Sequence, residues 1–121
     1  MNRLVICIAR TPLHWLVGPY TTVLRYAAPK SGRAIELPVW ALHHHDAWIV
    51  VVGEHDRKSW WRAFRRPLTA TLQSGTRPRS VQGQVLAGPD REAAVTAYLR
   101  RVPMARRSTS ADTPVVRFRP V

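Results

Sequence analysis

The sequence has few of the residues that most often build metal sites and nucleophilic centres. It contains one cysteine, Cys7, which therefore has no disulfide partner in the chain and cannot form a cysteine zinc site. Cys7 lies in an apolar run, so we expect it to be buried and inert, and a single thiol fits a reducing cytoplasm. No serine stands in a nucleophile elbow. A hydrolase is therefore disfavoured, and if the chain is an enzyme its reactive atom should belong to a cofactor.

Acidic residues and lysines are also scarce. Seven Asp and Glu face 19 Lys and Arg, which gives a formal charge of +12, and the two lysines are Lys30 and Lys58. Such an excess favours an anionic partner, either nucleic acid, a membrane surface or a polyanionic cofactor. A coding bias towards arginine explains the composition about as well, but it does not explain why both lysines fall in the two segments described below.

Long apolar runs are absent. The run from Leu4 to Ala9 is ended by Arg10 and is too short for a spanning helix, and no small-residue cleavage site follows it. Residues 3–17 are predicted to form an amphipathic helix, either packed on the domain or in peripheral contact with a membrane. We therefore expect a cytoplasmic protein of one domain, residues 1–121, and leave open both membrane association and a homodimer.

The remaining pattern predicts a mainly β (α+β) protein, a barrel or a sandwich of short antiparallel strands. Pro38 should place its strand at an edge or a bulge, and the apolar run 47–53 should be buried on both faces. Asp56 and Asp90 are expected to cap helices, and 104–112 should be a polar loop. The strands are expected at 20–27, 34–42, 47–53, 68–73, 80–87 and 114–118, and two further helices at 55–66 and 90–102.

Two segments are candidates for binding an anion. In the turn from Pro29 to Arg33, Gly32 permits backbone angles at which amides converge, while Lys30 and Ser31 add a charge and a hydroxyl. A charged surface turn is the plainer interpretation of this segment alone. The second segment runs from Arg57 to Arg62 at the expected start of a helix, where free amides favour anions.

Adjacent tryptophans in the second segment carry a further implication. Trp60 and Trp61 point about 100° apart on an α-helix, so both cannot face the core. One should pack inside, and the other should cover a groove, a partner or a flat ligand.

Three consecutive histidines, His43 to His45, precede Asp46. On a strand their side chains alternate, so at most two share a face. We expect an exposed hairpin tip rather than a zinc site.

Taken together, the motifs resemble the deazaflavin-dependent nitroreductase and quinone reductase family of actinobacteria. The resemblance covers nearly the whole chain, and its most specific parts are the Ser-Gly-Arg turn followed by Pro38 and the Trp-Trp-Arg block. The segments that carry it are TPLHW (11–15), PKSGR (29–33), ELPV (36–39), VG (52–53), KSWWRAFR (58–65) and TPVV (113–116).

The resemblance implies a split β-barrel of the FMN-binding, pyridoxamine-phosphate-oxidase-like type that binds coenzyme F-420, a deazaflavin with a phosphate and an oligoglutamate tail. It implies hydride transfer to a quinone, nitro or enone-type acceptor, with FMN as the alternative coenzyme. Glu54 and His55 would lie near the ring edge. The coenzyme-binding positions that it implies are Lys30, Ser31, Pro38, Val39, Trp40, Val52, Gly53, Glu54, Ser59, Trp60, Trp61 and Arg62.

The sequence departs from the family pattern in places that bear on affinity and activity. Pro29 and Ile35 stand where basic residues are usual, and Ala63 stands where asparagine is usual. Where some nitro-reducing members have tyrosines after the last helix, the residues are Val102, Ala105 and Ser108. Two alternatives therefore stay open: a non-catalytic flavin, deazaflavin or lipophilic-ligand binder, and a small basic barrel that binds single-stranded nucleic acid by charge and stacking.

Overall fold

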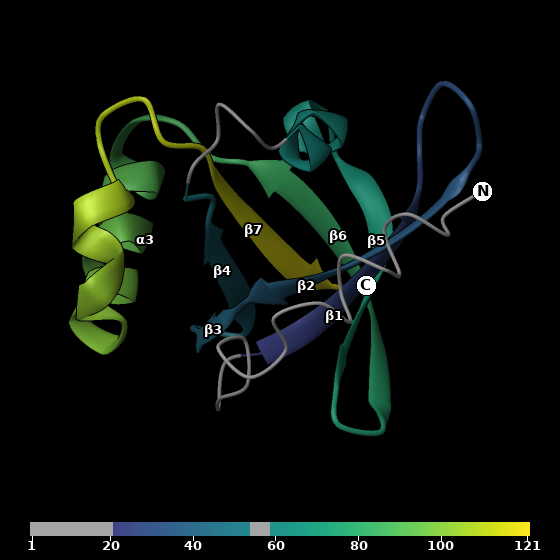
Figure 1. Cartoon of the computed structure of the whole chain (residues 1–121), viewed down its shortest axis with the longest axis horizontal. Helices are drawn as coiled ribbons and strands as arrows, with labels where there is room; N and C mark the ends of the chain where they lie inside the picture. The colour runs from purple at the N-terminus through teal and green to yellow at the C-terminus, as the bar shows by residue number, and fades with distance from the viewer. Residues whose placement is uncertain (1–20, 54–58) are drawn as a thin grey trace.

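The computed structural model describes residues 21–53 and 59–121, whose strands form one antiparallel sheet (Figure 1). The strands are hydrogen-bonded in the order β2-β1-β5-β6-β7-β4-β3. Their bounds are β1 (Thr21–Ala27), β2 (Ala34–Trp40), β3 (Leu42–His44), β4 (Ala47–Val51), β5 (Leu68–Ser74), β6 (Arg77–Val85) and β7 (Val115–Pro120). The helices are the 3-10 turns η1 (Trp60–Arg65) and η2 (Pro103–Ser108) and the α-helix α3 (Gly88–Arg101).

A single residue forces this sheet to curl. Strands β2 and β3 stand at opposite ends of the hydrogen-bonding order, yet Ala41 alone separates Trp40 from Leu42. Consecutive Cα atoms are about 3.8 Å apart, so the sheet must roll until its two outer strands are neighbours. The result is a half-barrel, which confirms the expected mainly-β, split-barrel class.

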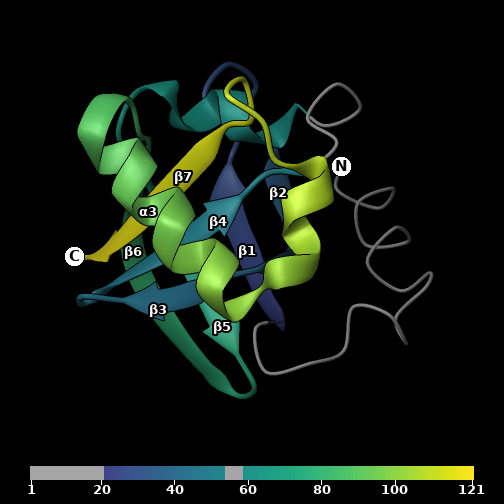
Figure 2. The ribbon, with the colours of Figure 1, turned by 90° about the vertical axis from the view of Figure 1, so that its left-hand side faces the viewer.

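Two apolar clusters lie on the two faces of β4. Val50 and Val52 point into the barrel, whereas Ile49 and Val51 point outward beneath α3. Figure 2 shows α3 lying across β4 and β3. The run 47–53 is apolar throughout because alternate side chains enter two different cores, as the sequence predicted.

A group of packed aromatic side chains fills one end of the barrel. Phe64 of η1 is fully buried and meets Phe118 of β7 edge to face, with ring centroids 5.2 Å apart. Tyr26 contacts the same ring at 5.1 Å. Gly83 of β6 makes room for both phenylalanines, since a Cβ there would lie 2.6 Å from each ring. Phe64 thus anchors η1 on the barrel.

Each of the six expected strands is present, but one of them is two strands and several differ in their ends. The expected strand 34–42 is two strands, because Ala41 and Leu42 are both buried and the alternation breaks where the chain changes edges. Pro38 lies in the edge strand β2, as predicted. The hairpin between β5 and β6 is tighter than expected: Ser74 pairs with Arg77, and Gly75 takes a φ of 63°.

Pro78 therefore lies inside β6 rather than in a loop. It precedes Val81, where pairing with β7 begins, so one side of the strand is open there and a proline is tolerated.

The helix predictions need three corrections. The described part of the expected helix 55–66 is a 3-10 turn, in which the Arg62 amide donates to the Ser59 carbonyl and Pro67 follows the end. Asp90 is not the cap of α3: the Gly88-Pro89 pair starts the helix earlier, so Ala87 is the N-cap and Asp90 lies in the first turn. The segment 104–112 is not a plain loop, because Pro103 starts η2.

The predictions for helix 3–17, Cys7, Glu54, His55 and Asp56 lie outside the described residues. Within 21–53 and 59–121, no helix is long and apolar enough to cross a bilayer.

We predict that Gly83→Ala lowers the free energy of unfolding by about 1–3 kcal/mol, because the new methyl group overpacks the Phe64–Phe118 contact. Urea unfolding followed by far-UV circular dichroism measures the change. Gln82→Ala, at the exposed neighbouring position of the same strand, is the matched control and should stay within about 0.5 kcal/mol of wild type. Equal stability of Gly83→Ala and wild type would contradict this packing.

Candidate functional site

The turn between β1 and β2 presents Lys30 and Ser31 to solvent. Both residues are exposed, and Gly32 takes a φ of 71°, a left-handed conformation that favours glycine. The Ala28 amide donates to the Arg33 carbonyl, and the Gly32 amide donates to the Ala28 carbonyl, each at 2.8 Å. The turn is therefore closed by its own backbone, with the lysine outside it.

These bonds change the expected phosphate cradle. The Gly32 amide is engaged within the turn, and the Arg33 amide donates to Ser31 Oγ at 3.2 Å. Neither amide is free to converge on an anion, because the turn uses both. What the turn offers an anion is the Lys30 ammonium, the Ser31 hydroxyl proton and the exposed Arg33 side chain.

The predicted positions on β2 point to different surroundings. Val39 is buried inside the barrel, and Pro38 is half-buried on the outer face of the edge strand. Trp40 packs on the cluster beneath α3, and its carbonyl accepts a hydrogen bond of 3.3 Å from the Tyr98 hydroxyl.

Two polar atoms at this end of β2 are buried without a hydrogen-bond partner. They are Thr21 Oγ1 and Trp40 Nε1. Thr21 and Trp40 are directly paired across β1 and β2, so both side chains leave the sheet on the same face. Buried donors that lack a partner are uncommon, and they often mark a place where water or a ligand supplies one.

The end of β4 is held by the segment after η2. The Val52 amide donates to the Pro114 carbonyl at 2.9 Å, and the Gly53 amide to the Val51 carbonyl at 3.1 Å. A Cβ on Gly53 would lie 3.0 Å from Ser108 Oγ. The glycine therefore lets η2 approach the end of the strand closely. Glu54, the next predicted position, lies outside the described residues.

The η1 turn places both tryptophans against the barrel. Trp60 and Trp61 are each half-buried and pack on the interior cluster, so the expectation that only one could do so is wrong. The reason is that η1 sits across the barrel end with Phe64 inserted, and core side chains surround it on two sides. Arg62 and Arg65 lie over the Trp61 ring, at 5.6 and 5.1 Å from its centroid. Ser59 is exposed.

Strand register brings most of these segments to one rim of the barrel. The turn 28–33 joins the end of β1 to the start of β2, and Leu68 after η1 pairs with Gly83 at the end of β6. Val51, at the end of β4, pairs with Val115 at the start of β7. One hydrogen bond joins the turn strand to η1: the Tyr26 hydroxyl donates to the Trp60 carbonyl at 3.4 Å.

Trp40 stands apart from this rim. Six residue steps separate it from Ala34 at the rim end of β2, which is about 20 Å of extended chain. A ligand that contacted both Lys30 and Trp40 would have to be elongated.

Charge at this rim is positive. The described carboxylates are Glu36, Asp46, Asp90, Glu92 and Asp112, and none of them lies in the turn 28–33 or in η1. The two carboxylates with ion pairs are Glu36 with Arg25 and Glu92 with Arg91. The cations of the turn and of η1 are thus unopposed by any carboxylate within 21–53 and 59–121, and they favour an anionic ligand.

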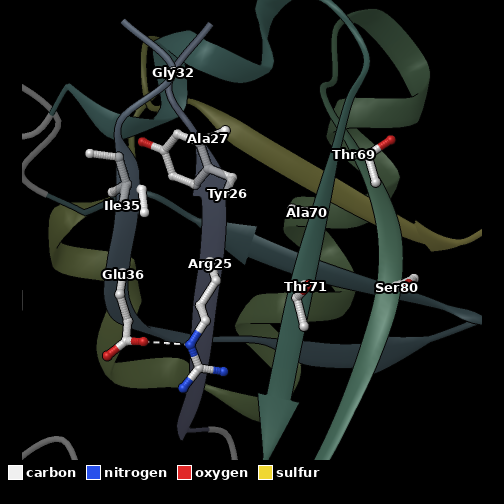
Figure 3. A pocket seen from close by; sticks show the side chains of 11 residues that line it. Arg25, Tyr26, Ala27, Gly32, Ile35, Glu36, Thr69, Ala70, Thr71 and Ser80 are labelled. Carbon is white, nitrogen blue, oxygen red and sulfur yellow. Dashed lines mark hydrogen bonds and ion pairs between the residues drawn. The ribbon is translucent and has the colours of Figure 1, made fainter. Parts of the chain in front are cut away.

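A shallow groove of about 360 Å³ that the sequence did not reveal lies beside the turn (Figure 3). Small side chains, Ala27 and Ala34, leave the space next to Gly32. A cross-strand row bounds it: Glu36 pairs with Arg25, Arg25 with Thr71 and Thr71 with Ser80. Arg25 bonds Glu36 and also donates to Gln73 at 2.6 Å. Such a row needs the register, which the sequence alone does not provide.

The described side chains of the rim can bind but offer little acid–base chemistry. Lys30, Ser31, Trp60, Trp61 and Arg62 supply positive charge, one hydroxyl and flat aromatic surface. The predicted histidines lie at the far end of the barrel, in the β3–β4 hairpin, where His43 stacks on Trp48 at 4.8 Å. His45 and Asp46 form the turn with positive φ, as expected for a hairpin tip.

The fold is shared with several solved structures. An F-420-H2-dependent reductase superposes with a TM-score of 0.65 at 17% identity, over 84% of this chain and 96% of that chain. A protein described as a domain-swapped dimer gives 0.67 at 16% identity, over 84% and 81%. A NimC/NimA family protein from Clostridium acetobutylicum gives 0.55 at 15% identity, over 97% and 82%.

At these identities the similarity establishes the fold, and it confirms the split barrel of flavin-reductase type that the resemblance implied. No protein-family model and no curated protein matches the sequence.

We predict an alkaline loss of stability that depends on Tyr98. Burial raises the pKa of Tyr98 to about 12 from an ordinary value of 10. The folded state thus favours the neutral phenol, so this contribution is complete below pH 10 and is lost as the pH rises towards 12. Its loss lowers the free energy of unfolding by about 2–3 kcal/mol.

Urea unfolding of wild type and Tyr98→Phe between pH 9 and 12 measures this effect. The variant loses the bond to the Trp40 carbonyl and is less stable at pH 9, but its stability should fall less steeply with pH. Parallel pH profiles for the two proteins would show that Tyr98 does not titrate as its burial implies.

Proposed function

We propose that this chain is an F-420-dependent oxidoreductase of the split-barrel family, which binds the deazaflavin coenzyme at the rim formed by the turn 28–33, the end of β4 and η1. In this proposal the coenzyme carries hydride to a quinone, nitro or enone-type acceptor. The fold shared with an F-420-H2-dependent reductase over 96% of that chain supports the proposal. The resemblance of the motifs in this sequence supports it independently.

The residues present fit such a coenzyme in the chemistry of their donors. Lys30 and Ser31 offer an exposed ammonium and a hydroxyl to a phosphate, and Arg62 adds a second cation beyond Trp61. The unpartnered Trp40 indole N–H can donate to a carbonyl group. The proposed coenzyme contacts are Lys30, Ser31, Pro38, Val39, Trp40, Val52, Gly53, Glu54, Ser59, Trp60, Trp61 and Arg62.

When bound, the deazaflavin supplies the hydride chemistry. The protein's own residues bind and orient: the cations hold the anionic part of the coenzyme, and Trp60 and Trp61 exclude water from the adjoining end of the barrel. The rim segments 28–33 and 59–66 carry no carboxylate or histidine that would act as a general acid. Glu54 and His55 are the nearest candidates in the sequence for that role.

One observation carries the proposal most directly. The two segments that the sequence marks as anion sites lie at the same end of the barrel, where the hydroxyl of Tyr26, in the strand that leads into the turn 28–33, donates to the Trp60 carbonyl. The described residues of the turn 28–33 and of η1 contribute cations and no carboxylate to this end of the barrel, which favours an anionic ligand.

We predict that Lys30→Ala weakens F-420 binding at least tenfold, because a charge-assisted hydrogen bond contributes about 1.5–3 kcal/mol. Quenching of F-420 fluorescence on titration with protein measures the dissociation constant. Arg77→Ala is the matched control: it removes an exposed cation from the β5–β6 hairpin at the opposite end of the barrel and should leave the affinity unchanged. An equal loss of F-420 affinity in both variants would show that the effect comes from the net charge of the protein and not from Lys30 itself.

Turnover separates an enzyme from an inert binder. Reduced F-420 and a menadione-type quinone should be converted faster with the protein than without it, whereas binding without conversion would support the non-catalytic alternative. Parallel titration with FMN decides between the coenzymes, and tighter binding of FMN would contradict the deazaflavin assignment.

Self-association is part of the proposal. One structural neighbour is described as a domain-swapped dimer, which supports a homodimer here. Light scattering coupled to size-exclusion chromatography should give twice the mass of the 13.8 kDa chain.

A further inference from the structure

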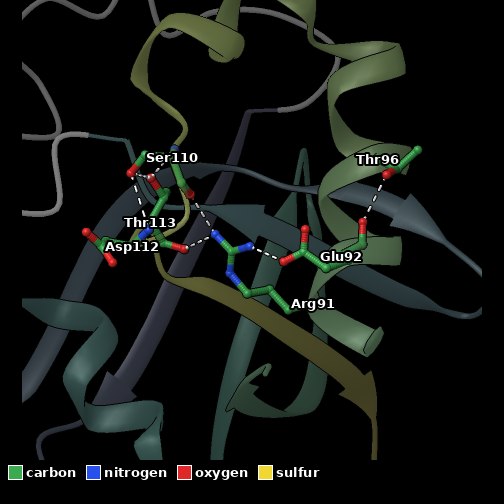
Figure 4. A network of polar contacts seen from close by, with 6 residues as sticks. All are labelled: Arg91, Glu92, Thr96, Ser110, Asp112 and Thr113. Carbon is green, nitrogen blue, oxygen red and sulfur yellow. Dashed lines mark hydrogen bonds and ion pairs between the residues drawn. The ribbon is translucent and has the colours of Figure 1, made fainter. Parts of the chain in front are cut away.

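Arg91 ties the start of α3 to the segment that precedes β7 (Figure 4). One guanidinium nitrogen, Nη2, donates to the Ser110 carbonyl at 2.7 Å and to the Thr113 carbonyl at 2.9 Å. The other, Nη1, donates to Glu92 at 2.5 Å. The Arg91 side chain is 12% exposed, against 70% for that of Glu92. The Arg91 side chain is therefore mostly buried, its bond to Thr113 is partly buried, and its ion pair with Glu92 lies at the surface.

A positive charge at the N-terminal end of a helix is electrostatically unfavourable unless a specific partner stabilises it. A cation within the first four residues of α3 lies near the positive end of the helix dipole, where an acidic residue is preferred. An exposed pair such as Arg91–Glu92 contributes little, about 0–1 kcal/mol. The two carbonyl groups, which accept from the two N–H bonds of Nη2, account for the position better than the ion pair does.

The segment that Arg91 holds is itself locked. The Ser110 amide donates to Thr113 Oγ1 at 2.8 Å, and the Thr113 hydroxyl contacts the Ser108 carbonyl at 3.4 Å. Thr113 is nearly fully buried. The segment 108–114 is thus a small polar unit that one side chain of α3 holds at Ser110 and at Thr113.

Segment 108–114 contacts the residues at the end of β4. The Pro114 carbonyl accepts from the Val52 amide, and Ser108 Oγ lies where a Cβ on Gly53 would come within 3.0 Å. A shift of segment 108–114 therefore moves the two groups that define the position of Val52 and Gly53. Both residues belong to the proposed coenzyme rim.

We propose that Arg91 is a positioning residue for the coenzyme site: through segment 108–114 it sets the place of Val52 and Gly53. Arg91 contacts neither of them and acts only through the carbonyl groups that it holds. The inference rests on the proposed function for its consequence in coenzyme binding, while the link from Arg91 to Val52 stands on the hydrogen bonds alone.

Amide hydrogen exchange of the full chain tests the link without coenzyme. In Arg91→Gln, whose side chain is too short to reach both carbonyls, the Val52 amide should exchange at least tenfold faster than in wild type. Arg91→Lys keeps the charge on a side chain that is one bond shorter, and it should fall between the two. The amides of β1 should keep their protection in both variants. Arg101→Gln, at an exposed cation near the other end of α3, should change nothing.

Coenzyme titration tests the consequence. Arg91→Gln should weaken F-420 binding about tenfold, and Arg91→Lys less, while Arg101→Gln binds like wild type. Unchanged Val52 exchange in Arg91→Gln would overturn the proposal. Loss of β1 protection in both Arg91 variants would also overturn it, because Arg91 would then serve general stability. If wild type does not bind F-420, the proposed function fails, and the exchange data still decide the positioning role.

Discussion

The contact between Phe64 and Phe118 inside the barrel is the constraint on which the rim depends. It exists because Gly83 has no side chain: a Cβ there would occupy the space of both rings. Through Phe64 this packing fixes η1 on the barrel end, and Tyr26 joins the same aromatic group from β1. The positions of the two tryptophans and of the arginines that cover Trp61 all follow from it.

The second constraint is the corner at Ala41. Because one residue joins the two outer strands, the sheet must curl, and the curl brings its rim loops together at one end. Within 21–53 and 59–121, the turn 28–33 and η1 carry cations and no carboxylate, and Ser31 and Lys30 project from a turn that is closed by its own hydrogen bonds. Under the proposed function, this rim would orient a coenzyme rather than perform acid–base chemistry.

Local sequence predicted the parts of this protein that depend on local forces. The strand expected at 20–27, the apolar run of β4 and the hairpin tip at His45 lie where their patterns place them, and α3 overlaps the helix expected at 90–102. What could not be predicted depends on tertiary packing. The strand break at Ala41 arises from a change of edge, and the burial of both Trp60 and Trp61 arises from Phe64 entering the barrel.

The same limit applies to the site. Pairing of the two candidate anion-binding segments came from a resemblance, and the structure adds a hydrogen bond from Tyr26, in the strand before the turn, to the Trp60 carbonyl. The turn amides of Gly32 and Arg33 are used internally, which a glycine in the sequence does not disclose. The Arg25 row and Arg91 have no motif, because their partners are defined by register and by backbone carbonyls far along the chain.

The central claim is that coenzyme F-420 binds at the rim formed by the Lys30–Gly32 turn and η1. Its most direct test is a titration of isotope-labelled protein with F-420, followed by the backbone amide and tryptophan indole signals. The account predicts shifts at Lys30, Ser31, Trp60, Trp61 and Arg62, with the Trp48 indole and the Gly75 amide at the other end of the barrel unchanged. Shifts confined to that other end, or none at saturating coenzyme, would contradict it.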